Sequence, residues 1–214
     1  MFYYEYKAKQ QGYQFVVGID EAGRGPLAGP VVACALLLKT HSFKNRICDS
    51  KLLTSLSRER AFKELRGKSL FGLGKIDEAV IDKINILEAT KQAMEKAIAE
   101  LFFQLAKVEG FAVKELQKRS FLLVDGNFFK SRRNYNIRNI IDGENKSLTI
   151  AAASIVAKVT RDRLMNEYDK LFPQYGFCRH KGYGTPEHFA ALKKNGPCRL
   201  HRKSFFPLRC PAEI

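Results

Sequence analysis

Short apolar runs alternate along this chain with longer segments in which leucine and isoleucine recur at spacings of three and four. The runs at residues 14–21 and 31–38 flank a turn rich in glycine and proline, and both have the character of buried strands. A third run, SFLLVD at residues 120–125, ends on an acid and is followed by glycine. Strands interleaved with helices pack as a sheet covered by helices. The sequence therefore predicts an α/β fold.

The remaining elements follow from the same patterns. Further strands are expected at residues 69–75 and 136–141, and helices at residues 57–66, 77–107, 147–169 and 185–195. From residue 170 onward there are nine basic residues and two acidic ones, together with proline, glycine and aromatic residues. This composition predicts a main domain over residues 1–169 and a basic C-terminal extension over residues 170–214 that packs on it.

The chain carries a strong excess of positive charge. Its 37 lysine and arginine residues against 22 aspartate and glutamate residues give a net charge of +15. Such a field attracts polyanions, of which nucleic acid is the commonest in a cytoplasm. Generic solubility or proximity to ribosomes would explain the same charge, so charge alone indicates a class of partner and no reaction.

Two further features bear on location. The longest apolar run, residues 31–38, is far shorter than the roughly 20 residues that span a bilayer, and the N-terminal MFYYEYKAKQ does not resemble a signal peptide. The five cysteines are scattered and include no CxxC pair. This usage favours reduced thiols over disulfides or a zinc site, so we expect a cytoplasmic protein without a membrane anchor.

Three acids stand at the ends of the apolar strands. Asp20 and Glu21 close the first run and Asp125 closes the third, each just before a glycine-bearing loop. Ligands of α/β sheets bind at strand ends, and acids there are costly unless they are solvated, paired or bound to cations. Two divalent ions held by such oxygens can support phosphodiester hydrolysis. The alternative is that these acids are loop caps or partners of the many basic residues.

The motifs around these acids resemble those of the bacterial ribonuclease HII family. The resemblance covers nearly the whole chain, in the order expected for the family. Its segments are GIDEAGRGPLAGPVV from residue 18, DSKLL at 49–53, INILEAT at 84–90, LLVDGN at 122–127, IAAASIVAKVTRD at 150–162, FPQYGF at 172–177, HKGYGT at 180–185 and HRKSF at 201–205. It implies a ribonuclease H-like fold with a central mixed β-sheet flanked by helices, and a C-terminal helical extension.

The resemblance also implies an activity. The family hydrolyses the RNA strand of RNA/DNA hybrids and nicks duplex DNA 5′ to embedded ribonucleotides, leaving 3′-hydroxyl and 5′-phosphate ends. The implied cofactor is Mg²⁺ or Mn²⁺ at a two-metal-ion site. The implied partners are RNA/DNA hybrids and ribonucleotide-containing duplex DNA, with residues 1–169 as the catalytic domain of a monomer.

Four acids of the chain match the catalytic, metal-binding positions of the family. Asp20, Glu21 and Asp125 match the first three. The fourth position falls before the AAAS segment, where Glu144 replaces the usual aspartate and aligns without a gap. Glutamate also occupies the matching place in ribonuclease HIII. Asp142 is the rival for the fourth ligand if the loop is shifted, and its alternative role is that of a turn residue.

Other positions match residues that contact the substrate. Gly23, Arg24 and Gly25 match the loop that recognises the ribose 2′-hydroxyl, where glycines let the backbone approach the sugar. Tyr183 matches the tyrosine that senses the deoxyribose beyond the RNA–DNA junction. Outside the family these would be a plain turn and a rim tyrosine. Five basic residues in matching motifs are expected to contact phosphates, unless they are solvated surface charges: Lys51, Lys158, Lys181, Arg202 and Lys203. The four histidines are not spaced like metal ligands, and none is assigned to catalysis.

Three other functions compete with this one. The first is a non-catalytic nucleic-acid-binding protein of the same fold: the loss of a strand-end acid would favour it, and the presence of all three argues against it. A ribonuclease HIII would carry a different turn after the acid pair and a substantial N-terminal domain, whereas only residues 1–13 precede the first expected strand. A phosphate-binding NTPase is excluded because no glycine loop ends in Gly-Lys-Ser/Thr.

Overall fold

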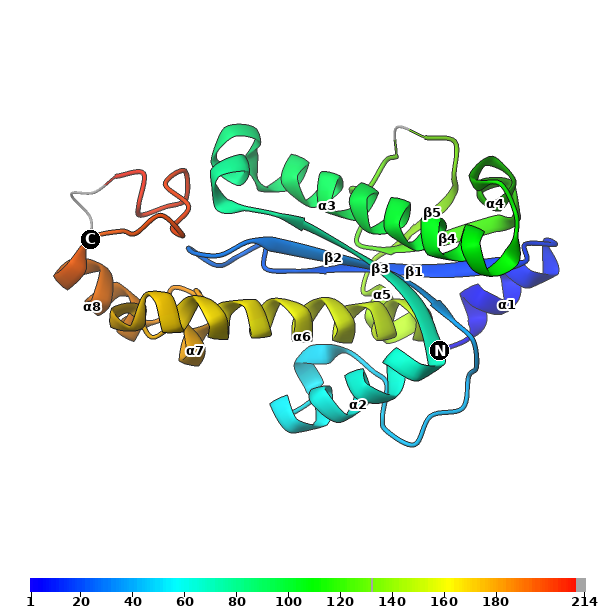
Figure 1. Cartoon of the computed structure of the whole chain (residues 1–214), viewed down its shortest axis with the longest axis horizontal. Coiled ribbons are helices and arrows are strands. Elements are labelled where there is room, and N and C mark those ends of the chain that lie inside the picture. Colours follow the sequence, from blue (N-terminus) through cyan, green and yellow to red (C-terminus); the bar gives the residue numbers. More distant parts are fainter. Residues whose placement is uncertain (132, 211–214) are drawn as a thin grey trace.

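Five strands form one sheet in the computed structural model, which describes residues 1–131 and 133–210 (Figure 1). They are β1 (Phe15–Ala22), β2 (Val31–Leu38), β3 (Ser69–Ile76), β4 (Ser120–Asp125) and β5 (Asn136–Ile140), in the spatial order β3-β2-β1-β4-β5. Strand β2 is antiparallel to β1 and β3, whereas β4 is parallel to both β1 and β5. The sheet is therefore mixed, as expected, and β1 lies at its centre.

Helices α3 (Glu78–Glu109) and α4 (Val113–Arg119) lie on one side of the sheet (Figure 1). Alternate residues of β1, Val17 and Ile19, point into the apolar core on this side, where Met94 and Leu101 of α3 are fully buried. Helix α3 is interrupted at Asn85, whose φ of 66° and capping side chain begin a second helical segment. The expected continuous helix over residues 77–107 is thus two segments joined at a kink.

Helices α2 (Ser55–Lys68) and α6 (Leu148–Leu171) lie on the other side, with the one-turn helix α5 (Gly143–Lys146) preceding α6 (Figure 1). Helix α6 packs directly on β1, since a Cβ atom on Gly18 would lie 2.1 Å from the carbonyl carbon of Thr149. Small helix residues such as Ala152 and Ala153 permit this approach and are fully buried. The close packing places the N-terminal half of α6 beside the strand end that carries Asp20.

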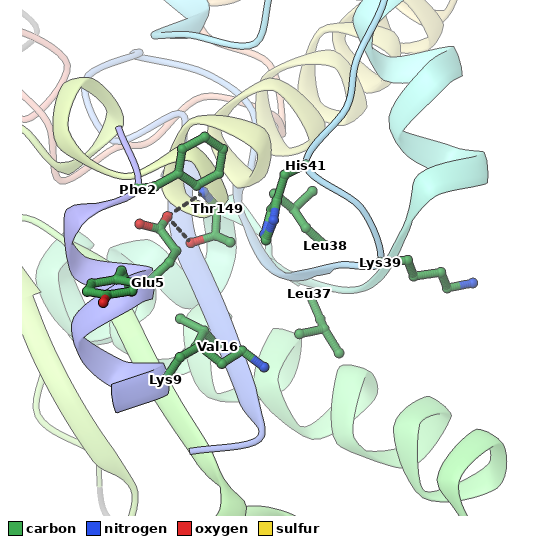
Figure 2. Close-up of a pocket in the computed structure, with 10 residues that line it drawn as sticks. Phe2, Glu5, Lys9, Val16, Leu37, Leu38, Lys39, His41 and Thr149 are labelled. Carbon is green, nitrogen blue, oxygen red and sulfur yellow. Dashed lines mark hydrogen bonds between the residues drawn. The ribbon is translucent and has the colours of Figure 1, made fainter. Parts of the chain in front are cut away.

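The N-terminal helix α1 (Tyr3–Gln10) is anchored by a buried carboxylate. Glu5 Oε1 accepts hydrogen bonds from Ser147 Oγ (2.6 Å) and from the N and Oγ1 atoms of Thr149 (3.1 and 3.0 Å), as Figure 2 shows for Thr149. The Met1 carbonyl accepts a further bond from Leu148 N (2.9 Å). Met1 and helix α1 thereby supply acceptors to backbone N–H groups in the first turn of α6.

The chain after α6 folds back against it. This segment contains the 3₁₀ turn η2 (Pro173–Tyr175) and helices α7 (Phe177–His180) and α8 (Pro186–Asn195), and residues 211–214 of the expected extension lie outside the described residues. Leu27, in the loop after β1, shares an apolar cluster with Met165 of α6 and with Phe177 and Leu192 of the C-terminal segment. Helix α6 continues past the expected boundary at residues 169 and 170, which falls in its last turn.

Three buried histidines form the polar centre of this C-terminal segment. His188 Nδ1 donates to the Tyr183 carbonyl (2.9 Å), so its Nε2 is left to accept from His201 Nε2 (3.0 Å). His201 Nδ1 in turn accepts from Cys198 N (2.9 Å). His180 stacks on His188 with ring centroids 4.4 Å apart. This arrangement requires neutral rings on His188 and His201, because a second proton on either would leave two donors facing each other.

The expected strands and longer helices all lie within two residues of their observed bounds. Four helices begin after a side chain that accepts a hydrogen bond from the backbone N–H three residues on, and these caps are Thr54, Asp77, Ser147 and Thr185. Helix α1 was not expected because it buries only Glu5 and Ala8, which leaves no apolar stripe in the sequence. Within residues 1–131 and 133–210, none of the helices has the length and apolar character that crossing a bilayer needs.

The histidine cluster predicts a loss of stability in mild acid. Burial lowers the pKa of both His188 and His201 from 6.5 to about 4. The unfolded chain therefore binds protons more readily, so the stabilisation is complete above pH 6.5 and is lost as the pH falls towards 4. Urea denaturation of the wild type across this range should show the fall. The His201→Gln variant should be less stable at pH 7 but show a flatter pH dependence, whereas His41→Gln should follow the wild type.

Candidate active site

The parallel pairing of β1 and β4 brings the strand-end acids together. Asp20 and Asp125 lie at the same edge of the sheet, because Ile19 pairs with Val124 one residue earlier in each strand. Helix α5 adds Glu144, and one carboxylate oxygen from each of these three acids lies within 4.8 Å of the others. Segments far apart in the sequence thus form a single carboxylate cluster.

Asp20 is the most enclosed acid of the cluster. Its side chain is buried, and its Oδ1 accepts a hydrogen bond from Glu21 N (2.7 Å). Burial raises the pKa of Asp20 well above its ordinary value, and the negative charges of Glu21, Asp125 and Glu144 raise it further. Asp20 in its charged form therefore needs a compensating cation.

Glu21 has one paired and one unpaired oxygen. Its Oε1 accepts from Arg24 Nη1 (3.1 Å), whereas its Oε2 is buried and has no hydrogen-bond partner among the described residues. Burial raises the pKa of Glu21, and the Arg24 guanidinium opposes that rise. An unsatisfied buried carboxylate oxygen is costly, so Glu21 also indicates that a cation belongs here.

Glu144 is held at the cluster by basic and hydroxyl groups. Lys51 Nζ donates to Glu144 Oε1 (2.7 Å), and Ser154 Oγ of α6 lies 3.5 Å from Oε2. Burial raises the pKa of Glu144, and the hydrogen bond from Lys51 opposes that rise. Asp142, the rival for the fourth ligand, is exposed, has a left-handed φ of 55° and is not part of the cluster.

These residues fit a hard divalent cation. The three acids of the cluster offer carboxylate oxygens, which Mg²⁺ and Mn²⁺ prefer, and the pKa rise at Asp20 together with the orphaned oxygen of Glu21 marks missing positive charge. Asp125 is oriented for this role by Gly143 N, which donates to its Oδ1 (2.7 Å). The cluster can therefore bind a divalent metal ion.

A pocket of about 290 Å³ opens over the cluster. Its walls bring together several of the residues expected to contact the substrate, namely Gly23, Arg24, Gly25, Lys51, Lys158 and Tyr183. Tyr183 is 43% exposed, and the position of a Cβ atom on Gly25 lies 3.8 Å from its ring. Lys158 pairs with Asp162 (2.8 Å) and lies 5.9 Å from the Tyr183 ring centroid. The Figure 2 cavity, of about 410 Å³, shares no lining residue with this pocket.

The other three basic residues expected at the substrate lie elsewhere. The phosphate contact expected for Arg202 is wrong, because its side chain is fully buried. Its guanidinium donates instead to the carbonyls of Gly23, Arg24 and Gly29. Lys181 donates from Nζ to Asn166 Oδ1 (2.6 Å), outside the pocket lining.

Lys203 is exposed on the outside of the C-terminal segment, and its backbone N donates to Asp82 Oδ2 (2.9 Å). Neither this lysine nor Lys181 is among the residues that line the pocket. Any contact they make with a nucleic acid therefore lies beyond the carboxylate pocket.

Comparison with known proteins identifies the family. The family model for ribonuclease HII matches residues 17–207 of the chain. The chain belongs to the ribonuclease HII family. A curated ribonuclease HII from Acetivibrio thermocellus is 47% identical over 210 residues, which cover 94% of this chain and 73% of the relative. The chain is therefore an endoribonuclease of the hydrolase class.

Solved structures support the same fold. Ribonuclease H2 from Pyrococcus horikoshii matches with a TM-score of 0.69 at 22% identity, covering 94% of this chain and 98% of that chain. Bst-RNase HIII, solved in complex with Mn²⁺, matches with a TM-score of 0.65 at 17% identity, covering 97% and 72%. At these identities the likeness concerns the fold alone, and it confirms the expected ribonuclease H-like architecture.

Some residues of the site were not singled out from the sequence. Ser50 and Ser154 lie beside Glu144 and share a hydrogen bond between their hydroxyl groups (2.8 Å). Arg161 lies beneath the Gly-Arg-Gly loop and donates to the Pro30 carbonyl (2.9 Å). A serine in an apolar helix such as α6 is too common to indicate a site. A fully buried arginine is rare, so an arginine in a helix that is otherwise rich in small residues could have indicated the role of Arg161.

Replacing Asp20 by Asn should separate metal binding from folding. The amide oxygen can keep the bond from Glu21 N, while loss of the negative charge relieves the carboxylate cluster. We expect Asp20→Asn to unfold no earlier than the wild type without divalent ions. Mn²⁺ at 100 times its Kd should stabilise the wild type by about 3 kcal/mol, or about 5–10 °C for a chain of this size, and should leave the variant unmoved. Thermal unfolding with and without Mn²⁺ measures both effects.

Asp142→Asn is the matched control for this experiment. If Asp20→Asn showed the same Mn²⁺-dependent rise in melting temperature as the wild type, Asp20 would not be a metal ligand.

Proposed function

We propose that the chain hydrolyses the RNA strand of RNA/DNA hybrids and nicks duplex DNA on the 5′ side of embedded ribonucleotides, leaving 3′-hydroxyl and 5′-phosphate ends. The observation that carries this proposal is the carboxylate cluster of Asp20, Asp125 and Glu144 in one pocket with the Gly-Arg-Gly loop and Tyr183. The pocket thus combines carboxylates suited to phosphodiester hydrolysis with a loop and a tyrosine that can contact the sugar.

Asp20, Glu21, Asp125 and Glu144 would hold the metal ions in this proposal. Two divalent ions, Mg²⁺ or Mn²⁺, would supply a nucleophilic water and charge stabilisation for the leaving oxygen. The protein keeps the acids in place through Gly143 N at Asp125 and Ser154 Oγ at Glu144. Glu144 is longer than the usual aspartate by one methylene, and the looser geometry that Mn²⁺ tolerates favours that ion.

The Gly-Arg-Gly loop would recognise the ribose 2′-hydroxyl. Gly23 has a φ of 97°. Beyond the chain neighbours of Gly25, the nearest atom of the described residues lies 3.8 Å from the position of its Cβ atom, so the backbone can approach a sugar. Arg24 is held between the Glu21 carboxylate and the face of Phe128, whose centroid lies 4.5 Å from the guanidinium carbon. The 2′-hydroxyl is the group that distinguishes ribose from deoxyribose, so a loop that contacts it can recognise a single ribonucleotide.

Tyr183 and the lysines would contact the sugars and phosphates on either side of the ribonucleotide. The exposed ring of Tyr183 can stack on the deoxyribose that follows the junction. Lys51 and Lys158 line the pocket and would contact phosphates near the cut, whereas Lys181 and Lys203 would contact the backbone farther away. In this proposal residues 1–169 form the catalytic domain, and residues 170–214 are a basic extension packed on it that adds Tyr183, Lys181 and Lys203 to the substrate contacts, in a cytoplasmic monomer.

Substitutions at the fourth acid test the catalytic assignment. Glu144→Gln should lower the turnover of a duplex with one ribonucleotide at least about 100-fold, because changing even an outer-shell partner of a metal site costs 10–100-fold. Glu144→Asp should keep part of the activity, since a carboxylate remains. Asp142→Asn should stay close to the wild type. Cleavage assays in Mg²⁺ and in Mn²⁺ measure all three, and the reverse ranking of Glu144→Gln and Asp142→Asn would move the ligand to Asp142.

Tyr183 and Lys203 should affect different properties of the enzyme. Tyr183→Ala should lower cleavage at a single ribonucleotide in DNA about tenfold more than cleavage of a long hybrid, because one stacking contact is lost. Lys203→Ala should weaken binding to every duplex and reduce the slope of affinity against salt by about one. Parallel cleavage and salt-titration assays distinguish them. An unchanged substrate ratio in Tyr183→Ala would remove the junction role.

A further inference from the structure

Two arginines lie fully buried beneath the Gly-Arg-Gly loop. Arg161 of α6 and Arg202 of the C-terminal segment are the largest side chains with almost no exposed surface. Among residues 1–131 and 133–210, neither guanidinium forms an ion pair with a carboxylate, and every hydrogen bond that the two side chains donate goes to a backbone carbonyl. Burial lowers the pKa of Arg202 to about 9. The negative charges of Glu78 and Asp82 oppose this lowering of the Arg202 pKa, but neither carboxylate forms an ion pair with the guanidinium. Burying two cations without a directly paired carboxylate is costly, so a purely structural role would be better served by neutral groups.

Arg202 turns the carbonyl groups of the loop inward. Its Nη2 donates to Gly23 O (2.6 Å) and its Nη1 to Arg24 O (2.9 Å), while Nε donates to Gly29 O (2.9 Å). In a trans peptide the C=O and the following N–H point in opposite directions. The N–H groups of Arg24 and Gly25 therefore point away from Arg202, and both residues line the pocket. The described residues supply no hydrogen-bond acceptor for either N–H.

Arg161 joins the same loop to the turn that carries Tyr183. Its Nη2 donates to Ala28 O (3.1 Å) and its Nη1 to Lys181 O (3.0 Å), two residues before Tyr183. The loop and the turn also bond directly, since Leu27 N donates to the Gly182 carbonyl (2.8 Å). A Cβ atom on Gly23 would lie 2.0 Å from Arg161 Nε, so the loop rests on the guanidinium itself. The two walls of the pocket are thus held at a set spacing.

We propose that Arg161 and Arg202 are positioning residues that set the preference of the enzyme for ribonucleotides. Arg202 presents the N–H groups of Arg24 and Gly25 as paired donors to the 2′-hydroxyl oxygen of a ribose. Arg161 fixes the distance between these donors and the ring of Tyr183. This inference rests on the proposed function, because it concerns how that site discriminates between sugars.

The test compares binding of two duplexes that differ by one oxygen atom. Fluorescence anisotropy in EDTA measures the affinity for a DNA duplex with one ribonucleotide and for the all-DNA duplex of the same sequence. Arg202→Lys keeps the positive charge but loses the planar fork of donors, so the peptides are no longer oriented. We expect it to lower the ribonucleotide preference about tenfold, the effect of losing one to two hydrogen bonds to the ligand, with little change for the all-DNA duplex. Arg161→Lys should lower the same preference.

Controls separate this role from simple destabilisation. Arg163→Lys, two residues farther along α6 at a partly exposed arginine, should keep the wild-type preference. A structural role alone would lower the melting temperature and the active fraction of the variants, but it would not change the ratio of the two affinities. A folded Arg202→Lys protein with the wild-type ratio would overturn the proposal. If Arg202→Lys does not fold, Arg161→Lys decides, and its retention of the ratio would overturn the proposal equally.

Cleavage assays on the wild type keep the two proposals distinguishable. A wild type that prefers the ribonucleotide duplex in EDTA but cuts nothing in Mg²⁺ or Mn²⁺ would contradict the proposed reaction and leave the positioning role standing. A wild type that cuts hybrids but binds both duplexes equally would contradict the positioning role and leave the reaction standing.

Discussion

The contact between α6 and β1 is the constraint on which the rest of the molecule depends. Helix and strand meet without a side chain between them at Gly18, so the helix has little freedom to slide or rotate. From that fixed position α6 places Ser154 beside the carboxylates, Lys158 in the pocket wall, Arg161 under the substrate loop and Met165 in the core of the C-terminal segment. A shift by one residue would turn each of them by about 100° and dismantle all four contacts at once.

Around this framework the protein tolerates two unfavourable concentrations of charge. Acids cluster at one end of the strands, where burial and mutual repulsion raise the pKa of Asp20. Two guanidinium groups are buried beneath the Gly-Arg-Gly loop, where their hydrogen bonds go to backbone carbonyls. Both arrangements are costly in the free protein. In the proposed function, the acids would gain cations, and the loop N–H groups that Arg202 orients would gain an oxygen acceptor from the substrate. Such a site favours binding over stability.

The sequence allowed the strands, the longer helices and the strand-end acids to be predicted, because their signals are local. The capping residues Thr54, Asp77, Ser147 and Thr185 explain why the helix starts were close to correct. Other features depend on groups distant in the chain. Helix α1 is held by Glu5 reaching across to the start of α6, and the loop carbonyls that bury Arg202 lie about 175 positions away in the chain. No window of sequence contains both partners of such a contact.

By itself the sequence therefore determined the class of fold, the acids and the family, since hydrophobic period, caps and ordered motifs are properties of neighbouring residues. Only the tertiary structure decided which basic residues can meet a substrate. Arg202 and Lys51 stand in equally matching motifs, yet one is fully buried under a loop and the other reaches Glu144 from the surface. The difference arises because the desolvation of a charge depends on what the folded chain places around it, and that surrounding is assembled from segments the sequence keeps apart.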